Sequence, residues 1–337
     1  MRNILNIGII GCGKHADNFH IPSFLRLKNK YRIIGFYDLN INRANYLKKK
    51  YKVGNVYSSL NSLLKDKLID VVDICSPPTF HYKQILKSIK KDKHVMVEKP
   101  MVIKSLNLKK IIKKNKSYKK NIFCLQQQNF RNETEVLKKF LKNKEKKLGR
   151  LLGIKAKAHV NFPKQINNSF TDKSISGGGP LIDQGSHIIG LVGHLFNYPK
   201  IKNIKTILFK KKNIKKKNFV FNIETAARLK LIFENKIYFE FDTSYLKKKK
   251  KNDFNINFLF DKFSITWPNL NYIDHQKREK KIKITKNKFL ASDKQFIHFH
   301  NIIKKNHKPL VSLSNILYIV KLIEDSYKLS KVIKINE

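Results

Sequence analysis

The chain has 337 residues, of which 41% are hydrophobic, and this length and apolar content predict two domains with large buried cores. No uninterrupted apolar run approaches the roughly 18 residues of a membrane span, so we expect a soluble protein with no membrane partner. The formal net charge of +48 comes from 64 lysines and only eight arginines, and arginine is the residue suited to bidentate contacts with phosphates and bases. A specific nucleic-acid partner is therefore not expected.

The lysines are spread along the whole chain, and the two densest runs predict surface loops. Residues 209–219 (FKKKNIKKKNF) and 246–253 (LKKKKKND) each lie between strand-like segments, so we expect both to be solvated. Their charge predicts non-specific attraction to RNA or anionic surfaces at low salt. The three cysteines lie in or directly after apolar runs, and their odd number leaves no disulfide framework, which favours a reduced, cytoplasmic protein.

The first motif along the chain, IGIIGCGKHA at residues 7–16, has two interpretations. A small residue before Cys12 is typical of a lipoprotein cleavage site, but Asn6 and Gly8 interrupt an apolar run that barely reaches the length of an export signal. The alternative is a β-branched strand, a G-x-G-x-x-A loop and a helix, in which the first glycine makes a tight turn and the second leaves room for a pyrophosphate. The loop residues expected to contact a dinucleotide are Gly11, Cys12, Gly13, Lys14 and His15.

The next strand-like segment supplies a partner for this loop. YRIIGFYDLN ends near Asp38, 25 residues after Gly13, where a carboxylate can accept hydrogen bonds from both hydroxyls of an adenosine ribose. Asp38 would also repel a 2′-phosphate, so the sequence favours NAD as the cofactor. Arg43 and the abundant lysines weaken this preference and leave NADP as an alternative.

The first 128 residues repeat a strand, a turn and a helix-length segment. Strands are predicted at residues 4–10, 32–37, 70–75, 94–98 and 121–127. This alternation indicates parallel strands joined by crossover helices. We therefore expect residues 1–128 to form an α/β unit, a doubly wound NAD(P)-binding Rossmann domain.

The alternation of strand-like and helix-length segments ends after residue 128. One lysine-rich helix is followed by five long strand-like runs, from RLLGIKAKAHVNF to DFNINFLF, joined mostly by short polar turns as in an antiparallel sheet. Two helices near residues 291–306 and 312–330 are expected to follow. Residues 129–337 are thus predicted to form an α+β domain with a large, mostly antiparallel open sheet.

Three residues combine a cation, a carboxylate and a base. Lys99 follows the fourth predicted strand, at the sheet edge where open α/β folds bind ligands, and its ammonium can stabilise a developing alkoxide. Asp183 and His187 are four residues apart in an apolar segment with a proline near its start, so both project from one face of a helix. His194 lies about 10 Å further along the helix axis, too far to share an ion with His187, and no metal site is predicted.

Four stretches carry a resemblance to a known family. They are the glycine loop, ICSPPTFHY (74–82), HVMVEKP (94–100) and GGGPLIDQGSHIIG (177–190). Together they resemble the Gfo/Idh/MocA family, named after glucose-fructose oxidoreductase, inositol dehydrogenase and a rhizopine-catabolism protein. QQQNFR (126–131) and IEDSYKLSK (323–331) resemble the family's domain junction and last helix, so the resemblance spans nearly the whole chain.

The resemblance implies a cis peptide before Pro100 and cofactor contacts beyond the glycine loop. The implied contacts are Arg43 beside the adenine, Ser76, Pro77 and His81 at the nicotinamide-side ribose, Glu98 at the nicotinamide ribose, Lys99 beside it in the sequence, and Gln128 at the junction, where Arg131 is a further candidate. The resemblance also implies that His187 is the general acid/base, that Asp183 orients the substrate and that Lys99 tunes the proton transfer. The sequence leaves open whether Lys99 or His187 carries the proton. The chain departs from the family at Gly190, where members often have an acidic residue.

We therefore expect an NAD-dependent enzyme that transfers a hydride between nicotinamide and a secondary hydroxyl of a sugar, cyclitol or nucleotide sugar. By resemblance, the sheet of the second domain also forms the interface of a homodimer or homotetramer. Two alternatives use the same fold, namely an NAD-dependent glycosidase that oxidises its sugar transiently and a catalytically silent dinucleotide-binding protein. The glycosidase would turn over without added NAD, whereas the silent protein would keep the glycine loop without the chemistry.

Overall fold

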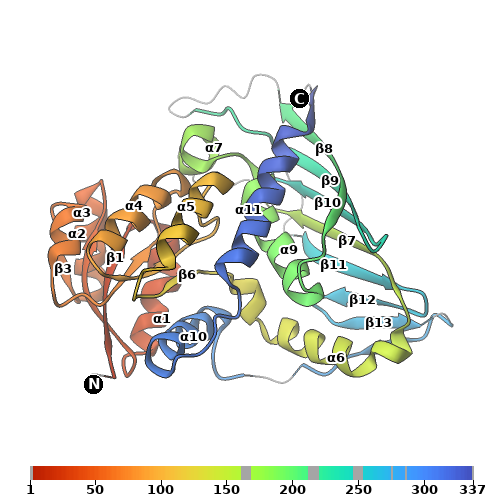
Figure 1. Ribbon diagram of the computed structural model, residues 1–337, viewed down its shortest axis with the longest axis horizontal. Coiled ribbons are helices and arrows are strands. Elements are labelled where there is room, and N and C mark those ends of the chain that lie inside the picture. The colour runs from red at the N-terminus through yellow and green to blue at the C-terminus, as the bar shows by residue number, and fades with distance from the viewer. Residues whose placement is uncertain are drawn as a thin grey trace. The chain divides into compact units, whose positions relative to one another are not determined.

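The computed structural model describes residues 3–160, 168–211, 220–245, 253–274, 276–284 and 287–335. The chain, drawn in Figure 1, divides into two compact units. The first comprises Met1–Gln127 and Phe289–Leu317, and the second comprises Gln128–Lys288 and Tyr318–Glu337. The two lysine-rich runs that we expect to be solvated fall almost entirely outside the described residues.

The first unit is built on a six-stranded parallel sheet with the strand order β3-β2-β1-β4-β5-β6. Its strands are β1 (Leu5–Ile10), β2 (Tyr31–Tyr37), β3 (Asn55–Val56), β4 (Val71–Ile74), β5 (His94–Val97) and β6 (Ile122–Cys124). The parallel sheet and the five predicted strands are confirmed, whereas the two-residue β3 is too short to show a periodic pattern. The strand order reverses between β1 and β4, which is where open α/β sheets form ligand sites.

Helices connect these strands, and one helix from late in the chain joins the same unit. The helices are η1 (Ala16–His20), α1 (Ile21–Arg26), α2 (Ile41–Tyr51), α3 (Leu60–Lys65), α4 (Pro78–Lys90), α5 (Ser105–Asn115) and α10 (Ala291–Lys305). The Tyr31 hydroxyl donates to the Phe296 carbonyl oxygen at 2.6 Å, and the Arg26 guanidinium pairs with buried Asp293 at 2.7 Å. These contacts place α10 with the first unit, so the second unit is not the continuous segment 129–337.

The second unit is built on a nine-stranded mixed sheet with the strand order β14-β13-β12-β11-β7-β10-β9-β8-β15. Only β7 with β10 and β8 with β15 pair in parallel, so the predicted mostly antiparallel sheet is confirmed. Its strands are β7 (Leu151–His159), β8 (Ile201–Lys211), β9 (Ala226–Phe233), β10 (Tyr238–Ser244), β11 (Asp253–Phe260), β12 (Phe263–Trp267), β13 (Asn271–Asp274), β14 (Glu279–Lys281) and β15 (Ser330–Ile335). The remaining helices of the chain are η2 (Gln127–Phe130), α6 (Asn132–Leu148), α7 (Asn168–Thr171), α8 (Lys173–Ser176), α9 (Pro180–Phe196) and α11 (Leu313–Lys328).

Helix α9 packs against β7, β9 and β10 and is the most apolar helix near the predicted chemistry. Thirteen of its 17 residues are buried, which fixes the helix firmly on the sheet. The four residues that keep some exposure are Asp183, Gln184, His187 and Phe196. The two predicted catalytic residues of this helix therefore lie where the sheet does not cover it.

Trp267, the single tryptophan of the chain, is buried in the core of the second unit, and its substitution tests the packing there. Its side chain is 0% exposed, and its Nε1 donates to the Thr134 hydroxyl of α6 at 3.2 Å. We expect Trp267→Ala to lower the free energy of unfolding by about 3–5 kcal/mol through the cavity it leaves, and Trp267→Phe to lower it less. Urea unfolding followed by far-UV circular dichroism measures both, and Phe170→Ala, which alters a 43% exposed ring, should stay within about 0.5 kcal/mol of wild type. A Trp267→Ala protein as stable as the Phe170→Ala control would contradict this packing.

Candidate functional site

The glycine loop after β1 has a backbone that requires its first glycine. Gly11 has a φ of +95°, its amide donates to the Tyr37 carbonyl oxygen at 2.8 Å, and a Cβ there would lie 2.5 Å from the Ser76 amide nitrogen. At Gly13, in contrast, no described atom lies within 4 Å of the position that a Cβ would take. Lys14, the next residue in the chain, is exposed. The loop therefore leaves room for a ligand to approach the Gly13 backbone, as a pyrophosphate must in a Rossmann fold.

Asp38, directly after β2, is held against this loop. Its Oδ2 accepts a hydrogen bond from the Cys12 amide at 2.7 Å, and its Oδ1 accepts one from the Asn40 amide at 2.8 Å. These bonds orient the carboxylate, while each oxygen keeps a second lone pair for a further donor such as a ribose hydroxyl. Burial, and then the charge of Asp38, raise the pKa of the Cys12 thiol, so the thiol stays protonated. Arg43 is exposed on α2.

The loop after β4 is supported by a buried histidine. His81 is 0% exposed, and its two ring nitrogens lie 2.7 Å from the Ser76 carbonyl oxygen and 3.0 Å from the Pro100 carbonyl oxygen. Burial lowers the pKa of His81, while the hydrogen bonds to the Ser76 and Pro100 carbonyl oxygens act in the opposite direction. The Ser76 hydroxyl donates to Gln84 at 2.6 Å, and Pro77 precedes the first residue of α4. His81 thus connects the loop that follows β4 to the loop that follows β5.

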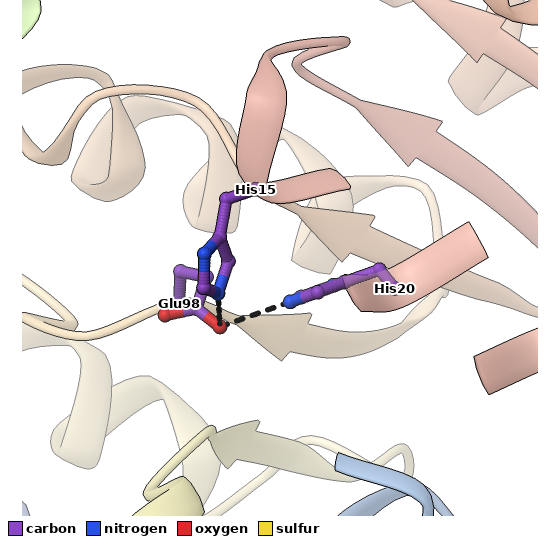
Figure 2. A group of neighbouring side chains, drawn as sticks. All are labelled: His15, His20 and Glu98. Carbon is purple, nitrogen blue, oxygen red and sulfur yellow. Dashed lines mark hydrogen bonds and ion pairs between the residues drawn. The ribbon is translucent and has the colours of Figure 1, made fainter. Parts of the chain in front are cut away.

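Glu98, at the end of β5, joins two histidines (Figure 2). Its Oε1 lies 3.2 Å from His15 Nε2 and 3.0 Å from His20 Nε2. Its Oε2 accepts a hydrogen bond from the Lys99 amide at 3.0 Å, and the predicted cis peptide joins Lys99 to Pro100. Burial would raise the pKa of Glu98, but His15 and His20 hold it well below its usual range. A charged carboxylate therefore links the glycine loop, η1 and β5.

His20 and Asp73 belong to this cluster although the sequence analysis did not select them. His20 Nδ1 lies 2.8 Å from Asp73 Oδ2 and 3.1 Å from Cys75 Sγ, and the side chains of His20 and Asp73 are 1% and 0% exposed. Burial alone would lower the pKa of His20, but the charge of Asp73 outweighs it and raises this pKa well above its ordinary value. One signal was present in the sequence, because Asp73 is the only charged residue in the apolar run VVDIC and a buried charge needs a partner.

Two overlapping groups in this cluster have the donor types of a metal site. One consists of His15, His20 and Glu98, and the other of His20, Asp73 and Cys75, with donor atoms within 4.8 Å of one another in each. Both groups depend on His20, whose ring nitrogens already face Glu98 and Asp73, so hydrogen bonds account for the arrangement. The expectation that the protein uses no metal was based on His187 and His194 and stays a prediction.

In the second unit, α9 places Asp183 and His187 one turn apart, as predicted from their spacing. Asp183 Oδ2 accepts hydrogen bonds from the Tyr245 hydroxyl at 3.1 Å and from Gln184 Nε2 at 2.6 Å. Burial, and then the charge of Asp183, raise the pKa of Tyr245 well above its usual range, so its phenol remains a donor. The Asp183 carboxylate is therefore held in one orientation. Lys99, the third predicted catalytic residue, belongs to the first unit.

The start of α9 is anchored by Glu224, which the sequence analysis did not select. This carboxylate is 2% exposed, and its Oε1 accepts hydrogen bonds from the Gly179 amide at 3.0 Å, the Leu181 amide at 3.2 Å and the Tyr327 hydroxyl at 2.6 Å. A Cβ at Gly179 would lie 2.2 Å from the Glu224 carbonyl oxygen, so only glycine permits this approach. No local pattern could reveal an anchor whose partners are 43 to 103 residues away.

Three further candidates from the sequence differ in their surroundings. His194 is buried, Lys138 Nζ lies 3.3 Å from its Nε2, and burial lowers its pKa to about 4, so it is a neutral structural residue. Arg131 pairs with Glu133 at 3.0 Å and lies over the ring of Trp267, which is a packing role. Gln128 has a buried Oε1 with no hydrogen-bond partner among the side chains and backbone that the structure describes.

Two family models match the chain. The model described as an oxidoreductase family with an NAD-binding Rossmann fold matches residues 5–125, and the model of the GFO/IDH/MocA C-terminal domain matches residues 137–266. The chain therefore belongs to the Gfo/Idh/MocA family of oxidoreductases. The predicted family, the oxidoreductase class and the nicotinamide dinucleotide cofactor are confirmed.

The chain is also similar to individual proteins. It is 26% identical to D-glucoside 3-dehydrogenase of Escherichia coli over 278 residues, which are 78% of this chain and 76% of that protein. It is 26% identical to scyllo-inositol 2-dehydrogenase (NADP(+)) of Bacillus subtilis, over 58% of this chain and 53% of that protein. The chain thus spans about half the length of the second relative.

A solved structure shows the same fold at low sequence identity. KijD10, a 3-ketoreductase from Actinomadura kijaniata in complex with NADP and TDP-benzene, superposes with a TM-score of 0.84 at 13% identity, covering 99% of this chain and 100% of that chain. Among the described helices of the present structure, none has the length and apolarity to cross a bilayer.

The anchor at Glu224 predicts a stability that depends on pH. Burial raises the pKa of Glu224, so the folded protein keeps a proton that the unfolded chain releases. Wild-type stability should therefore fall as pH rises from the unfolded pKa near 4.5 toward the raised folded value. Glu224→Gln keeps an acceptor oxygen without the charge, so its free energy of unfolding should increase relative to wild type over that window.

Urea unfolding at several pH values between about 4 and 8 measures this difference. As a control, Glu224→Leu leaves the donors of Gly179, Leu181 and Tyr327 unpaired and should lose about 2–4 kcal/mol at every pH. Parallel pH profiles for wild type and Glu224→Gln would show that Glu224 is not the titrating group.

Proposed function

We propose that the protein transfers a hydride between a nicotinamide dinucleotide, with NAD preferred, and a secondary hydroxyl of a sugar, cyclitol or nucleotide sugar. The observation that carries this proposal is on α9, where Asp183 and His187 keep some exposure on a helix that is otherwise almost wholly buried. Relatives named for a D-glucoside and for scyllo-inositol support a ring alcohol as the substrate.

Residues of the first unit fit the dinucleotide. The space at Gly13 admits a pyrophosphate, and the oriented carboxylate of Asp38 can accept ribose hydroxyls while opposing a 2′-phosphate. The remaining proposed contacts in this unit are Gly11, Cys12, Lys14, His15, Arg43, Ser76, Pro77, Glu98 and Lys99, with His81 supporting the loops after β4 and β5. Gln128, the first residue of the second unit, is a further proposed contact. When bound, the nicotinamide supplies the acceptor or donor of the hydride.

The proposed chemistry on the substrate is proton transfer and charge stabilisation. An imidazole can accept a proton near neutral pH, which suits His187 to the role of a general base that takes the hydroxyl proton. Asp183, held by Tyr245 and Gln184, accepts a hydrogen bond from a substrate hydroxyl and orients the ring. The Lys99 ammonium stabilises the developing alkoxide and favours its formation. Either His187 or Lys99 can be the group that finally carries the proton.

We also propose that the two units have different functions. The first unit binds the dinucleotide, and the second binds the substrate and, through its nine-stranded sheet, a second copy of the chain. Among the described residues, the edge strands of that sheet are β14 and β15, and both lie outside the matched residues 137–266. We place the enzyme in the cytoplasm, which the three free cysteines support.

Cofactor preference is tested by titrating the protein with NADH and NADPH and following fluorescence. At about 0.3 M salt, where non-specific attraction to the lysines is screened, NADH should bind more tightly than NADPH. Asp38→Asn removes the charge and should reduce or reverse this preference, because the 2′-phosphate is no longer repelled. Asp92→Asn, which alters a 71% exposed acid of the same unit, is the matched control and should leave both affinities unchanged. An unaltered preference in Asp38→Asn would overturn the role of Asp38.

The catalytic assignments are tested by turnover with a panel of sugars and cyclitols, measured as NAD reduction at saturating cofactor. His187→Asn and Lys99→Met should each lower kcat by about 100-fold or more. The affinity of His187→Asn for NADH should stay within about threefold of wild type. The residue that carries the proton is the one whose loss also removes the pH dependence of kcat. His307→Asn, at an exposed position, serves as the control. Unchanged kcat in both active-site variants would favour a different reaction.

A further inference from the structure

His20 is a buried histidine whose two ring nitrogens each face a carboxylate. His20 is 1% exposed, yet its Nδ1 lies 2.8 Å from Asp73 Oδ2 and its Nε2 lies 3.0 Å from Glu98 Oε1. A neutral imidazole has a single N–H and can donate to only one of these carboxylates, whereas an imidazolium donates to both. The geometry therefore fits a charged ring between two charged carboxylates.

The surroundings of His20 favour the charged ring. The elements packed against it contribute two carboxylates, a thiol that burial keeps protonated, a second imidazole and two aromatic rings. These groups are Asp73, Cys75, Glu98, His15, Phe24 and Phe296. Asp73 Oδ1 is buried and makes no hydrogen bond within the described part of the chain, so the charge of Asp73 depends heavily on His20.

We propose that His20 is a positioning residue that holds Glu98, and through it His15 of the glycine loop, in the arrangement that binds the dinucleotide. This inference rests on the proposed function, in which Glu98 and His15 contact the cofactor. Asp73 of β4 contacts and orients His20, at the end of η1. His20 in turn orients Glu98, which follows β5, and Glu98 restrains His15 (Figure 2). The chain of contacts connects the sheet interior to a side chain that is 44% exposed.

Two substitutions distinguish a role of His20 in positioning Glu98 from a role limited to pairing with Asp73. In His20→Asn the amide nitrogen stands near the place of Nδ1, so the contact with Asp73 is kept and the contact with Glu98 is lost. In His20→Gln the longer amide reaches toward the place of Nε2 and can donate to Glu98. If His20 served only to neutralise buried Asp73, the Glu98 contact would be dispensable for ligand binding.

The first measurement is the affinity of the full chain for NADH, with circular dichroism to verify the fold of each variant. Loss of a hydrogen bond to a charged group predicts that His20→Asn binds NADH about tenfold to 100-fold more weakly than wild type, and that His20→Gln lies between them. His300→Asn is the matched control, because His300 is also buried in this unit but faces the Asn3 carbonyl oxygen at 2.8 Å. It should bind NADH within about twofold of wild type.

The second measurement is made on the wild-type protein, and one variant is used only to assign the signals. Nitrogen-15 NMR of histidine-labelled wild-type protein at pH 8 should show both ring nitrogens of His20 protonated, with the assignment made from the Glu98→Gln protein. A structural histidine in the neutral form would show one protonated and one unprotonated nitrogen.

The outcomes separate this inference from the proposed function. Tight NADH binding by wild type together with equally tight binding by His20→Asn would overturn the inference and leave the proposed function intact. A neutral His20 ring at pH 8 would also overturn it. If wild type binds neither NADH nor NADPH, the proposed function fails, and the inference fails with it.

Discussion

A carboxylate buried away from water must find a cation or several hydrogen-bond donors, and this constraint shapes both units of the protein. In the first unit, Asp73 lies within the parallel sheet and is paired with His20. In the second, Glu224 takes donors from Gly179, from the following turn of α9 and from Tyr327. Neither acid is a proposed ligand contact, but each fixes an element that carries one. Buried polar partners thus determine where the site groups lie.

The overall charge makes these local pairs more important. With 72 basic and 24 acidic residues, the chain attracts any anion, including both nicotinamide dinucleotides. Such attraction is non-specific and screened by salt, whereas a carboxylate oriented at short range discriminates between ligands. Asp38 is oriented by the amides of Cys12 and Asn40, and Asp183 by the hydroxyl of Tyr245. In the proposed function, selectivity therefore depends on these oriented acids within a strongly basic protein.

Helix α9 is fixed by its packing and carries two of the proposed catalytic residues. Because 13 of its 17 residues are buried on β7, β9 and β10, the helix cannot rotate without exposing its apolar side. Asp183 and His187 consequently keep one direction relative to the sheet. The fold of this chain matches KijD10 with a TM-score of 0.84 at 13% identity, so this fold tolerates wide differences in sequence.

The amino-acid sequence by itself determined the features that depend on neighbours along the chain. Periodicity located the strands of both sheets from β1 to β11 except the short β3, and the loop at Gly11 and the helix spacing of Asp183 and His187 were evident from local pattern. Only the tertiary structure decided that α10 belongs with the first unit, that His81 points at two carbonyl oxygens, that His20 contacts Glu98 and that Glu224 accepts a hydrogen bond at the start of α9. The physical reason is that a buried polar group is satisfied by whatever the fold brings within about 3 Å, and that partner can stand anywhere in the sequence.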